Sequence, residues 1–259
     1  MKQYFKTLWA ATKKNLLTRS RYRVDFIMAF FWPLFYPLTN YFISKGLAGP
    51  ANEGISSFQA LTGHVDYASF MIIGSLIWMF INFLLWSGGA ALYYDRITGT
   101  FETQWITPAP KSAMVLGNTL SVIILTIFPL MAGTFIFNIT GMIHIHNFLN
   151  LAISVVILLP FLIGFLLTLS AITMRVREVS IIIQILRTVL AILCGMQFPL
   201  AVLPGYMQTI GKYIPITQSL NIMRGISIYN RPLSFYSSEI AYVLGTGFVL
   251  LFLSLLLFR

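Results

Sequence analysis

The sequence predicts an all-α integral membrane protein, because its charges are few and its apolar runs are both long and continuous. Of the 259 residues, 58% are hydrophobic and 9% are charged, and the mean hydropathy is +0.82. A soluble domain carries roughly 25% charged residues, so this chain cannot cover itself with a polar surface. The apolar residues form unbroken runs rather than short alternating strands, which favours helices over a membrane barrel.

Six of these runs are long enough to cross a bilayer. A span needs about 20 mostly apolar residues, because the hydrocarbon core is about 30 Å thick and a helix rises about 1.5 Å per residue. The predicted spans are residues 24–43, 70–92, 114–137, 148–172, 181–203 and 240–258. Prolines inside spans are tolerated in membranes and kink the helices; here they are Pro33, Pro37, Pro129 and Pro160.

Residues 1–23 precede the first span and have the pattern of a helix that lies on the membrane surface. On a helical wheel the apolar residues fall within a stripe of about 100°, and the lysines lie off it. The stripe consists of Phe5, Leu8, Trp9 and Leu16. A basic amphipathic helix with a tryptophan is typical of the membrane interface, so we expect an interfacial helix here. The alternative is a solvated tail.

The distribution of lysine and arginine predicts the orientation. If the N-terminus is inside, twelve of the seventeen basic residues lie on inner segments and four on outer ones, with Arg187 inside a span. Positive residues accumulate on cytoplasmic segments, so both termini are expected in the cytoplasm of a multi-pass protein in the inner or plasma membrane. The net charge of +10 therefore indicates orientation and attraction to anionic membrane lipids, not nucleic-acid binding.

A cytoplasmic segment, residues 93–113, joins the predicted second and third spans. It is longer than the usual connection of about 2–8 residues between helices, and it is amphipathic. Phe101, Trp105 and Ile106 offer apolar anchors of the kind that dominate protein interfaces, while Arg96 and Glu102 offer charges for a partner. The segment is therefore predicted to dock on another protein, with a plain connector as the alternative.

The outer segment before the last span, residues 204–239, is half apolar but cannot form one spanning helix. Prolines and glycines interrupt it at Pro204, Gly205, Gly211, Pro215, Gly225 and Pro232. Broken backbone at membrane depth must be buried in protein or line a wet cavity. We expect short re-entrant or outer-leaflet helices here, with a surface loop as the alternative.

The sequence contains no recognisable catalytic or nucleotide-binding motif. A P-loop has four residues between its glycines and a serine or threonine after its lysine, whereas five residues separate Gly205 from Gly211 and Tyr213 follows Lys212. His144 and His146 could face one way in an extended loop, but a closed metal site takes four ligands and no third is evident. The chain is therefore expected to bind no cofactor or metal.

Two segments resemble permeases of the type-2 ABC exporter family. In "DRITGTFETQWITPAP", which starts at Asp95, residues 99–102 match a Gly-Thr-hydrophobic-Glu block and Thr107-Pro108 a later Thr-Pro. In "FPLAVLPGYMQTIGKYIPITQSLNIMRGI", which starts at Phe198, the family pattern is matched by Phe198-Pro199, Leu203-Pro204, Pro215 and Arg224. With six predicted spans, the resemblance covers the whole chain in topology.

The resemblance implies that residues 93–110 form a coupling helix docked in a cleft of a separate ATPase subunit. The coupling residues it implies are Arg96, Gly99, Thr100, Phe101, Glu102, Trp105, Thr107 and Pro108. It also implies a second permease, identical or related, and places ATP and magnesium in the partner rather than in this chain. The cargo of such exporters is a lipid-linked glycan or a hydrophobic drug or lipid.

The same resemblance implies a pathway between two permeases, along the first, second and fifth spans. Aromatic faces there can hold sugar rings or apolar cargo, or can serve only for packing; they are Trp32, Phe35, Tyr36 and Phe198. Arg187 lies about 9 Å along the fifth span, where it either snorkels to the inner surface or meets an anionic cargo. The alternative class is a stand-alone carrier or channel-like protein, and an intramembrane enzyme ranks third because no catalytic group is present.

Overall fold

The computed structural model describes residues 2–48, 56, 58–60, 66–145, 148–176 and 178–258, and its regular structure is helical throughout this part. This confirms the predicted all-α class. The helices are α1 (Lys2–Arg21), α2 (Arg23–Ala48), α4 (Tyr67–Leu84), α5 (Ala91–Ile97), α6 (Thr100–Ile106), α7 (Lys111–Ile139), α8 (Phe148–Thr173), α9 (Val179–Leu193), α10 (Gly205–Lys212), α11 (Pro215–Ser227) and α12 (Ser237–Leu256). Short turns at Leu85–Gly89, Leu200–Val202 and Leu233–Tyr236 complete them.

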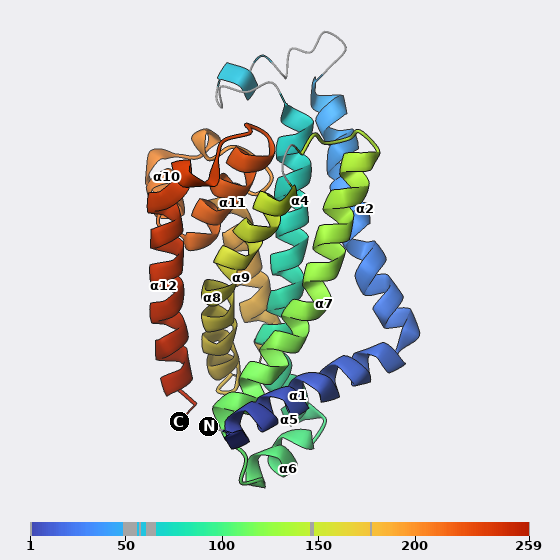
Figure 1. The fold of residues 1–259 in the computed structure, drawn as a ribbon, viewed down its shortest axis with the longest axis vertical. Helices are drawn as coiled ribbons and strands as arrows, with labels where there is room; N and C mark the ends of the chain where they lie inside the picture. Colours follow the sequence, from blue (N-terminus) through green and yellow to red (C-terminus); the bar gives the residue numbers. More distant parts are fainter. Residues whose placement is uncertain are drawn as a thin grey trace.

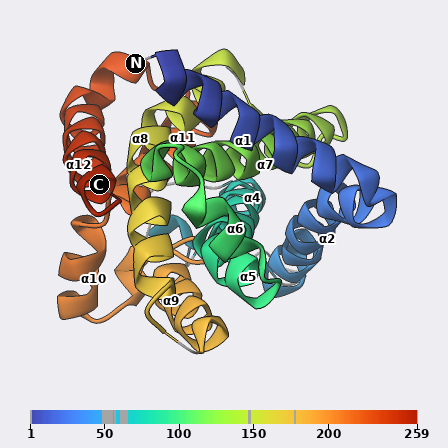
Figure 2. The same ribbon diagram turned by 90° about the horizontal axis from the view of Figure 1, so that it is seen from below.

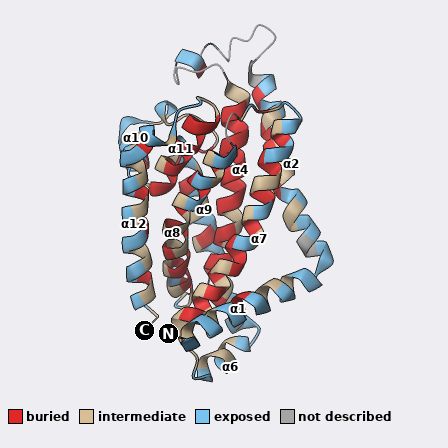
Figure 3. Ribbon diagram, in the orientation of Figure 1, coloured by how far each residue is buried: buried red, intermediate tan, exposed pale blue. Residues whose placement is uncertain are grey.

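Helix α4 is the centre of the bundle. Seen from below, α2, α7, α8 and α9 surround it (Figure 2). It is buried along most of its length, in contrast to the peripheral α12, whose outer side is exposed (Figure 3). A helix that is apolar on all sides is expected in the middle of a bundle, and "FMIIGSLIWMFI" at residues 70–81 has that composition.

Four helical stretches are long and apolar enough to cross a membrane: Tyr67–Ile97, Lys111–Ile139, Phe148–Thr173 and Leu233–Leu256. The prediction of six spans is therefore not confirmed among the described residues. Helix α2 covers the predicted first span, but Trp32, Tyr36, Asn40 and two prolines dilute its apolar character. The second span is longer than predicted, because α4 continues through the turn Leu85–Gly89 into α5.

The predicted fifth span, residues 181–203, is wrong in extent. Helix α9 has 15 residues and ends at Leu193, so it is about 22 Å long and shorter than the hydrocarbon core. The chain turns at Gly195, whose φ of 60° lies in the left-handed region that residues other than glycine avoid. The apolar run continues past this turn, which is why hydropathy alone overextended the helix.

The segment that follows consists of short helices, as predicted. Helix α11 is buried along nearly its whole length and packs on α8, α12 and α4, whereas α10 is largely exposed. Both lie at the upper end of the molecule in Figure 1. Interrupted backbone near a membrane must be buried in protein or line a wet cavity, and α11 is buried against other helices. Whether this segment enters the bilayer stays a prediction.

Helix α1 crosses the lower end of the bundle, and the N- and C-terminal ends of the chain lie at this same end (Figure 1). It packs on α7, where Thr12 Oγ1 donates to the carbonyl of Gly117 at 3.1 Å and Asn15 Nδ2 donates to Asn118 Oδ1 at 2.9 Å. Phe5 and Trp9 of the predicted apolar stripe point away from the protein and are exposed. This arrangement leaves their rings free for lipid, as an interfacial helix requires.

Candidate coupling site and pathway residues

The predicted coupling segment folds as two short helices joined at a glycine. Helix α5 ends at Ile97 and α6 begins at Thr100, so the single coupling helix of the prediction is divided. Gly99 has a φ of 70°, a left-handed conformation that costs L-residues energy and reverses the chain direction. Thr100 Oγ1 donates to the carbonyl of Asp95 at 3.2 Å and closes the turn from the other side.

Helix α6 is held in shape by its aromatic pair and by a lysine. The rings of Phe101 and Trp105 stack with centroids 4.5 Å apart, as expected for residues four positions apart on one helical face. Lys111 Nζ donates to the carbonyls of Trp105 and Thr107 and therefore caps the C-terminal end of α6. Both hydrogen bonds fix the position of the Thr107-Pro108 corner relative to α7.

A cleft of about 490 Å³ separates α6 from α1. Phe101 and Trp105 form its α6 side, and Lys14 and Asn15 form part of its α1 side. The predicted aromatic anchors therefore line an open space between two helices of the same chain, instead of projecting freely into solvent. The α6 end of the molecule can in this way accept a side chain or loop of another protein.

The outer surface of the two helices carries isolated apolar residues next to charged ones. Ile106 is 84% exposed and Ile97 is 61% exposed, and Glu102 between them is exposed as well. Thr107 and Pro108 are also exposed. Large apolar side chains that are exposed beside polar ones at an end outside the apolar bundle are typical of an interaction surface.

Arg96 makes its contacts within the chain. Its Nη1 donates to the carbonyl of Met174 at 2.8 Å and its Nη2 to the carbonyl of Val176 at 3.1 Å, across 78 and 80 residues of sequence. These carbonyls follow the C-terminal end of α8, where a cation is favoured by the helix dipole. Arg96 therefore ties α5 to the connection between α8 and α9. The sequence suggested that Arg96 pairs with a charge on a partner protein. These internal hydrogen bonds compete with such a pairing.

Two hydroxyl residues that the sequence did not single out hold the junction of α4 and α5. The junction is a π-helical turn, Leu85–Gly89, in which the regular helical hydrogen bonds are displaced. Ser170 Oγ donates to the carbonyl of Gly88 at 3.1 Å, and Thr173 Oγ1 donates to the carbonyl of Gly89 at 2.9 Å. Helix α8 thus satisfies the carbonyls at the point where the coupling helices leave the bundle.

Arg224 lies at the opposite end of the molecule and is completely enclosed. Its Nη1 and Nη2 donate to the carbonyls of Gly195 and Met196 at 2.9 and 2.8 Å, and its guanidinium lies 3.4 Å from the ring centroid of Phe70. Gly74 makes this possible, because a Cβ there would lie 1.7 Å from the Met196 carbonyl oxygen. We call Arg224 with these four partners the arginine clasp; it joins α11, α4 and the turn after α9.

Arg187 of α9 is half-buried and has polar neighbours rather than acidic ones. Its Nη1 donates to Asn82 Oδ1 of α4 at 2.9 Å, and its Nη2 donates to Gln184 Oε1 at 2.7 Å. Both partners are neutral amides, so the positive charge is oriented without being neutralised. The two amides hold the planar guanidinium between α4 and α9.

The predicted aromatic residues of the pathway divide into two groups. Trp32 and Phe35 are exposed, at 66% and 59%, and Trp32 lines a space between α2 and α7. Tyr36 and Phe198 are half-buried, and the hydroxyl of Tyr36 accepts a hydrogen bond from Gln197 Nε2. The structure therefore brings α2 and the turn after α9 together, but it leaves Trp32 and Phe35 away from that contact.

A family model described as "ABC-2 type transporter" matches residues 4–228, which run from α1 to the end of α11 and include both motif segments. The chain belongs to this family. A comparison with curated proteins gave no match. ABC-2 permeases are membrane proteins that lack the ATPase domain and work with ATPase subunits.

Within this ABC-2 permease, residues 96–108 gather at one end, together with α1. Among the described residues no group of three or more histidines, cysteines or acidic residues could hold a metal ion; His144 is described and exposed, and His146 lies outside the described residues. The residues that sequence reasoning missed are Ser170, Thr173 and Asn82. A serine and a threonine three positions apart near the end of a predicted span were the available signal, since they share one helical face.

Proposed function

We propose that this permease pairs with a second permease, identical or related, and that the pair forms the export pathway of an ATP-driven transporter. ATPase subunits would dock at the α6 end. The observation that carries the proposal is the pair of exposed isoleucines, Ile97 and Ile106, around Glu102 on a two-helix projection outside the bundle. Two large apolar side chains exposed together on one projection support a surface that a partner covers.

The same projection is mechanically connected to the bundle in two places. It continues α4 through the turn Leu85–Gly89, and Arg96 ties it to the end of α8. A π-helical turn is a local break in the hydrogen-bond ladder, so bending there disturbs fewer bonds than bending a regular helix. Movement of an ATPase against α6 can thus be transmitted to α4 and α8.

We place the α6 end in the cytoplasm, together with both termini. The predicted excess of basic residues on inner segments supports this orientation.

The cargo is a lipid-linked glycan or a hydrophobic drug or lipid. An anionic cargo group would meet Arg187, whose partners Asn82 and Gln184 carry no charge. A stand-alone carrier is disfavoured, because family members work with ATPase subunits.

Co-purification tests the proposed docking. Replacing Ile106 by Ala removes most of an apolar side chain from the interface, a loss of about 2 kcal/mol that corresponds to roughly a 30-fold weaker complex. The full-length permease carrying I106A is therefore expected to retain much less ATPase during affinity purification than wild type. Ile210→Ala, which shortens an exposed isoleucine on α10 at the other end, is the matched control. Equal ATPase retention by both variants would exclude docking on this surface.

A further inference from the structure

An apolar groove of about 860 Å³ lies between α2 and α7, next to the turn that joins α1 to α2. Helix α2 leans away from α7 toward its N-terminal end, and α1 closes the base of the resulting triangle (Figure 1). Aromatic and aliphatic side chains line most of the groove, among them Met28, Trp32, Ile124 and Phe128.

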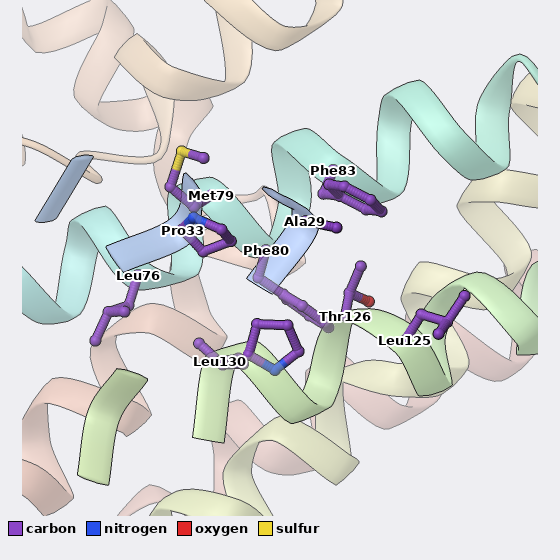
Figure 4. Close-up of a pocket in the computed structure, with 10 residues that line it drawn as sticks. Ala29, Pro33, Leu76, Met79, Phe80, Phe83, Leu125, Thr126 and Leu130 are labelled. Carbon is purple, nitrogen blue, oxygen red and sulfur yellow. The ribbon is translucent and has the colours of Figure 1, made fainter. Parts of the chain in front are cut away.

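The far end of the groove is closed by tight packing. There Ala29 and Pro33 of α2 face Phe80 and Phe83 of α4 and Thr126 of α7 (Figure 4). Only about 10 Å³ of space remains between these helices. The groove is thus bounded by α1 at one end and by this tight packing at the other.

The length of the groove matches one membrane leaflet. From Tyr22 to Trp32 the chain advances about 15 Å, at about 1.5 Å per residue. Half of a hydrocarbon core of about 30 Å is also about 15 Å. A lipid acyl chain lying along α2 from the level of the α1–α2 turn would therefore end near the point where the helices close.

A second, polar cleft of about 420 Å³ adjoins the groove on the side of α1 and α5. It is lined mostly by amide, hydroxyl and carboxylate side chains: Asn15, Thr18, Ser87, Asp95 and Asn118. Arg19 lines both the polar cleft and the apolar groove. Arg19 is thus the cation that the linings of the two spaces share. One space is apolar and the other polar, as the acyl chains and the headgroup of a lipid are.

Among the described residues, Arg19 has no short hydrogen bond or ion pair. Its hydrogen bond among the described residues is a long one, 3.4 Å from Nη1 to Ser87 Oγ. Burial lowers the pKa of its guanidinium from the ordinary value, because the neighbouring groups remove water from the charge. Arginine is suited to phosphate, which its planar donors can grip at two oxygens.

We propose that the groove and the polar cleft together bind one phosphatidylglycerol molecule of the adjacent leaflet. Its acyl chains fill the groove, its phosphodiester pairs with Arg19, and its glycerol hydroxyls lie among Asn15, Asn118 and Asp95. The hydroxyls can donate to the carboxylate of Asp95, whereas a second anionic group would be repelled by it. The lipid stays bound to the protein rather than being transported, and it holds the α1–α2 turn at the membrane surface.

Photolabelling of the full-length permease tests this site. The protein is reconstituted in phosphatidylcholine vesicles that contain a little phosphatidylglycerol with a photoreactive acyl chain, and labelled peptides are mapped by mass spectrometry. Label is expected in residues 28–32 and 124–128. Arg19→Gln should lower the labelling about tenfold, the effect of losing one charge-assisted hydrogen bond. Arg21→Gln should leave it unchanged, because Arg21 is exposed in the same turn and lines neither space.

A second variant separates the site from the stability of α1. Ile124→Trp should narrow the groove and lower the labelling while Arg19 remains. Three outcomes would overturn the proposal. The first is label spread evenly over the lipid-facing helices, α12 included. The second is equal labelling by a photoreactive diacylglycerol, which lacks the phosphate. The third is release of bound phosphatidylglycerol during ATP-driven transport, which would identify it as cargo.

Discussion

At the end of the molecule that carries α10 and α11, a buried arginine joins three elements, whereas at the end that carries α6 the helices leave open clefts. The arginine clasp satisfies two backbone carbonyls inside a closely packed core. At the α6 end, spaces of about 490 and 420 Å³ separate α1 from the coupling helices. Tight packing resists deformation, so movement is expected at the α6 end and not at the clasp.

The contrast also appears in the way each end uses its arginine. Arg224 is buried, and a Cβ at position 74 would lie 2.4 Å from its Nη2, so only glycine fits there. Arg96 reaches across an exposed surface to two carbonyls at the end of α8, where water and a partner can compete for it. Buried hydrogen bonds to a cation are costly to lose, and exposed ones are exchanged easily. The end that contains Arg224 is thus expected to stay rigid, and the end that contains Arg96 is expected to move.

The largest effect on stability is expected at the clasp. Arg224→Met keeps a long side chain but leaves the carbonyls of Gly195 and Met196 without donors in a dry site. Each orphaned carbonyl costs about 1–3 kcal/mol, so the variant should lose about 3 kcal/mol of unfolding free energy. The thermal midpoint of the purified permease would report the loss. Arg231→Met is the control, because Arg231 is exposed on the same side of the protein; equal midpoints for the two variants would contradict the contrast between the ends.

A smaller loss of stability, with a larger loss of coupling, is expected at the junction of α4 and α5. Thr173→Val removes the hydroxyl that serves the Gly89 carbonyl while keeping the side-chain shape, and it should cost about 1 kcal/mol. Export per ATP hydrolysed should fall, because the junction no longer transmits movement of α6 to α8. Thr168→Val is the control, because the hydroxyl of Thr168 donates to the carbonyl of Gly164 within α8 itself. Coupling should persist in this variant. Normal coupling in both variants would mean that the junction is not part of the transmission.

The long apolar helices were predictable from the sequence, because a helix that crosses a membrane needs an apolar run that matches the thickness of the hydrocarbon core. Residues 114–137 and 148–172 were predicted, and α7 and α8 are observed at Lys111–Ile139 and Phe148–Thr173. The end of α9 was not predictable from hydropathy, because the apolar run does not stop where the backbone turns. Gly195, followed by Pro199, was the only local signal of that turn.

The candidate site was predictable only in its local part. The Phe101–Trp105 pair follows from spacing on one helix, and Gly99 is a helix-breaking residue, although the segment was predicted as one coupling helix. The bonds from Arg96 to Met174 and from Arg187 to Asn82 join residues 78 and 105 positions apart. A single sequence contains the donors and acceptors but not the packing that pairs them.

The smallest change in stability, and the sharpest test of where the pathway runs, is expected at Arg187, which lies in neither the clasp nor the coupling helices. Its partners Asn82 and Gln184 are amides, so Arg187→Lys and Arg187→Gln should each change the unfolding free energy by about 1 kcal/mol or less. If Arg187 meets an anionic cargo, Gln should lower export more than Lys, because Lys keeps the charge and loses only the planar fork. If Arg187 only snorkels to the surface, Lys should serve as well as Arg, and Gln should reduce the amount of inserted protein rather than its activity. Export measured per inserted molecule distinguishes these cases, and equal values for wild type, Lys and Gln would remove Arg187 from the pathway.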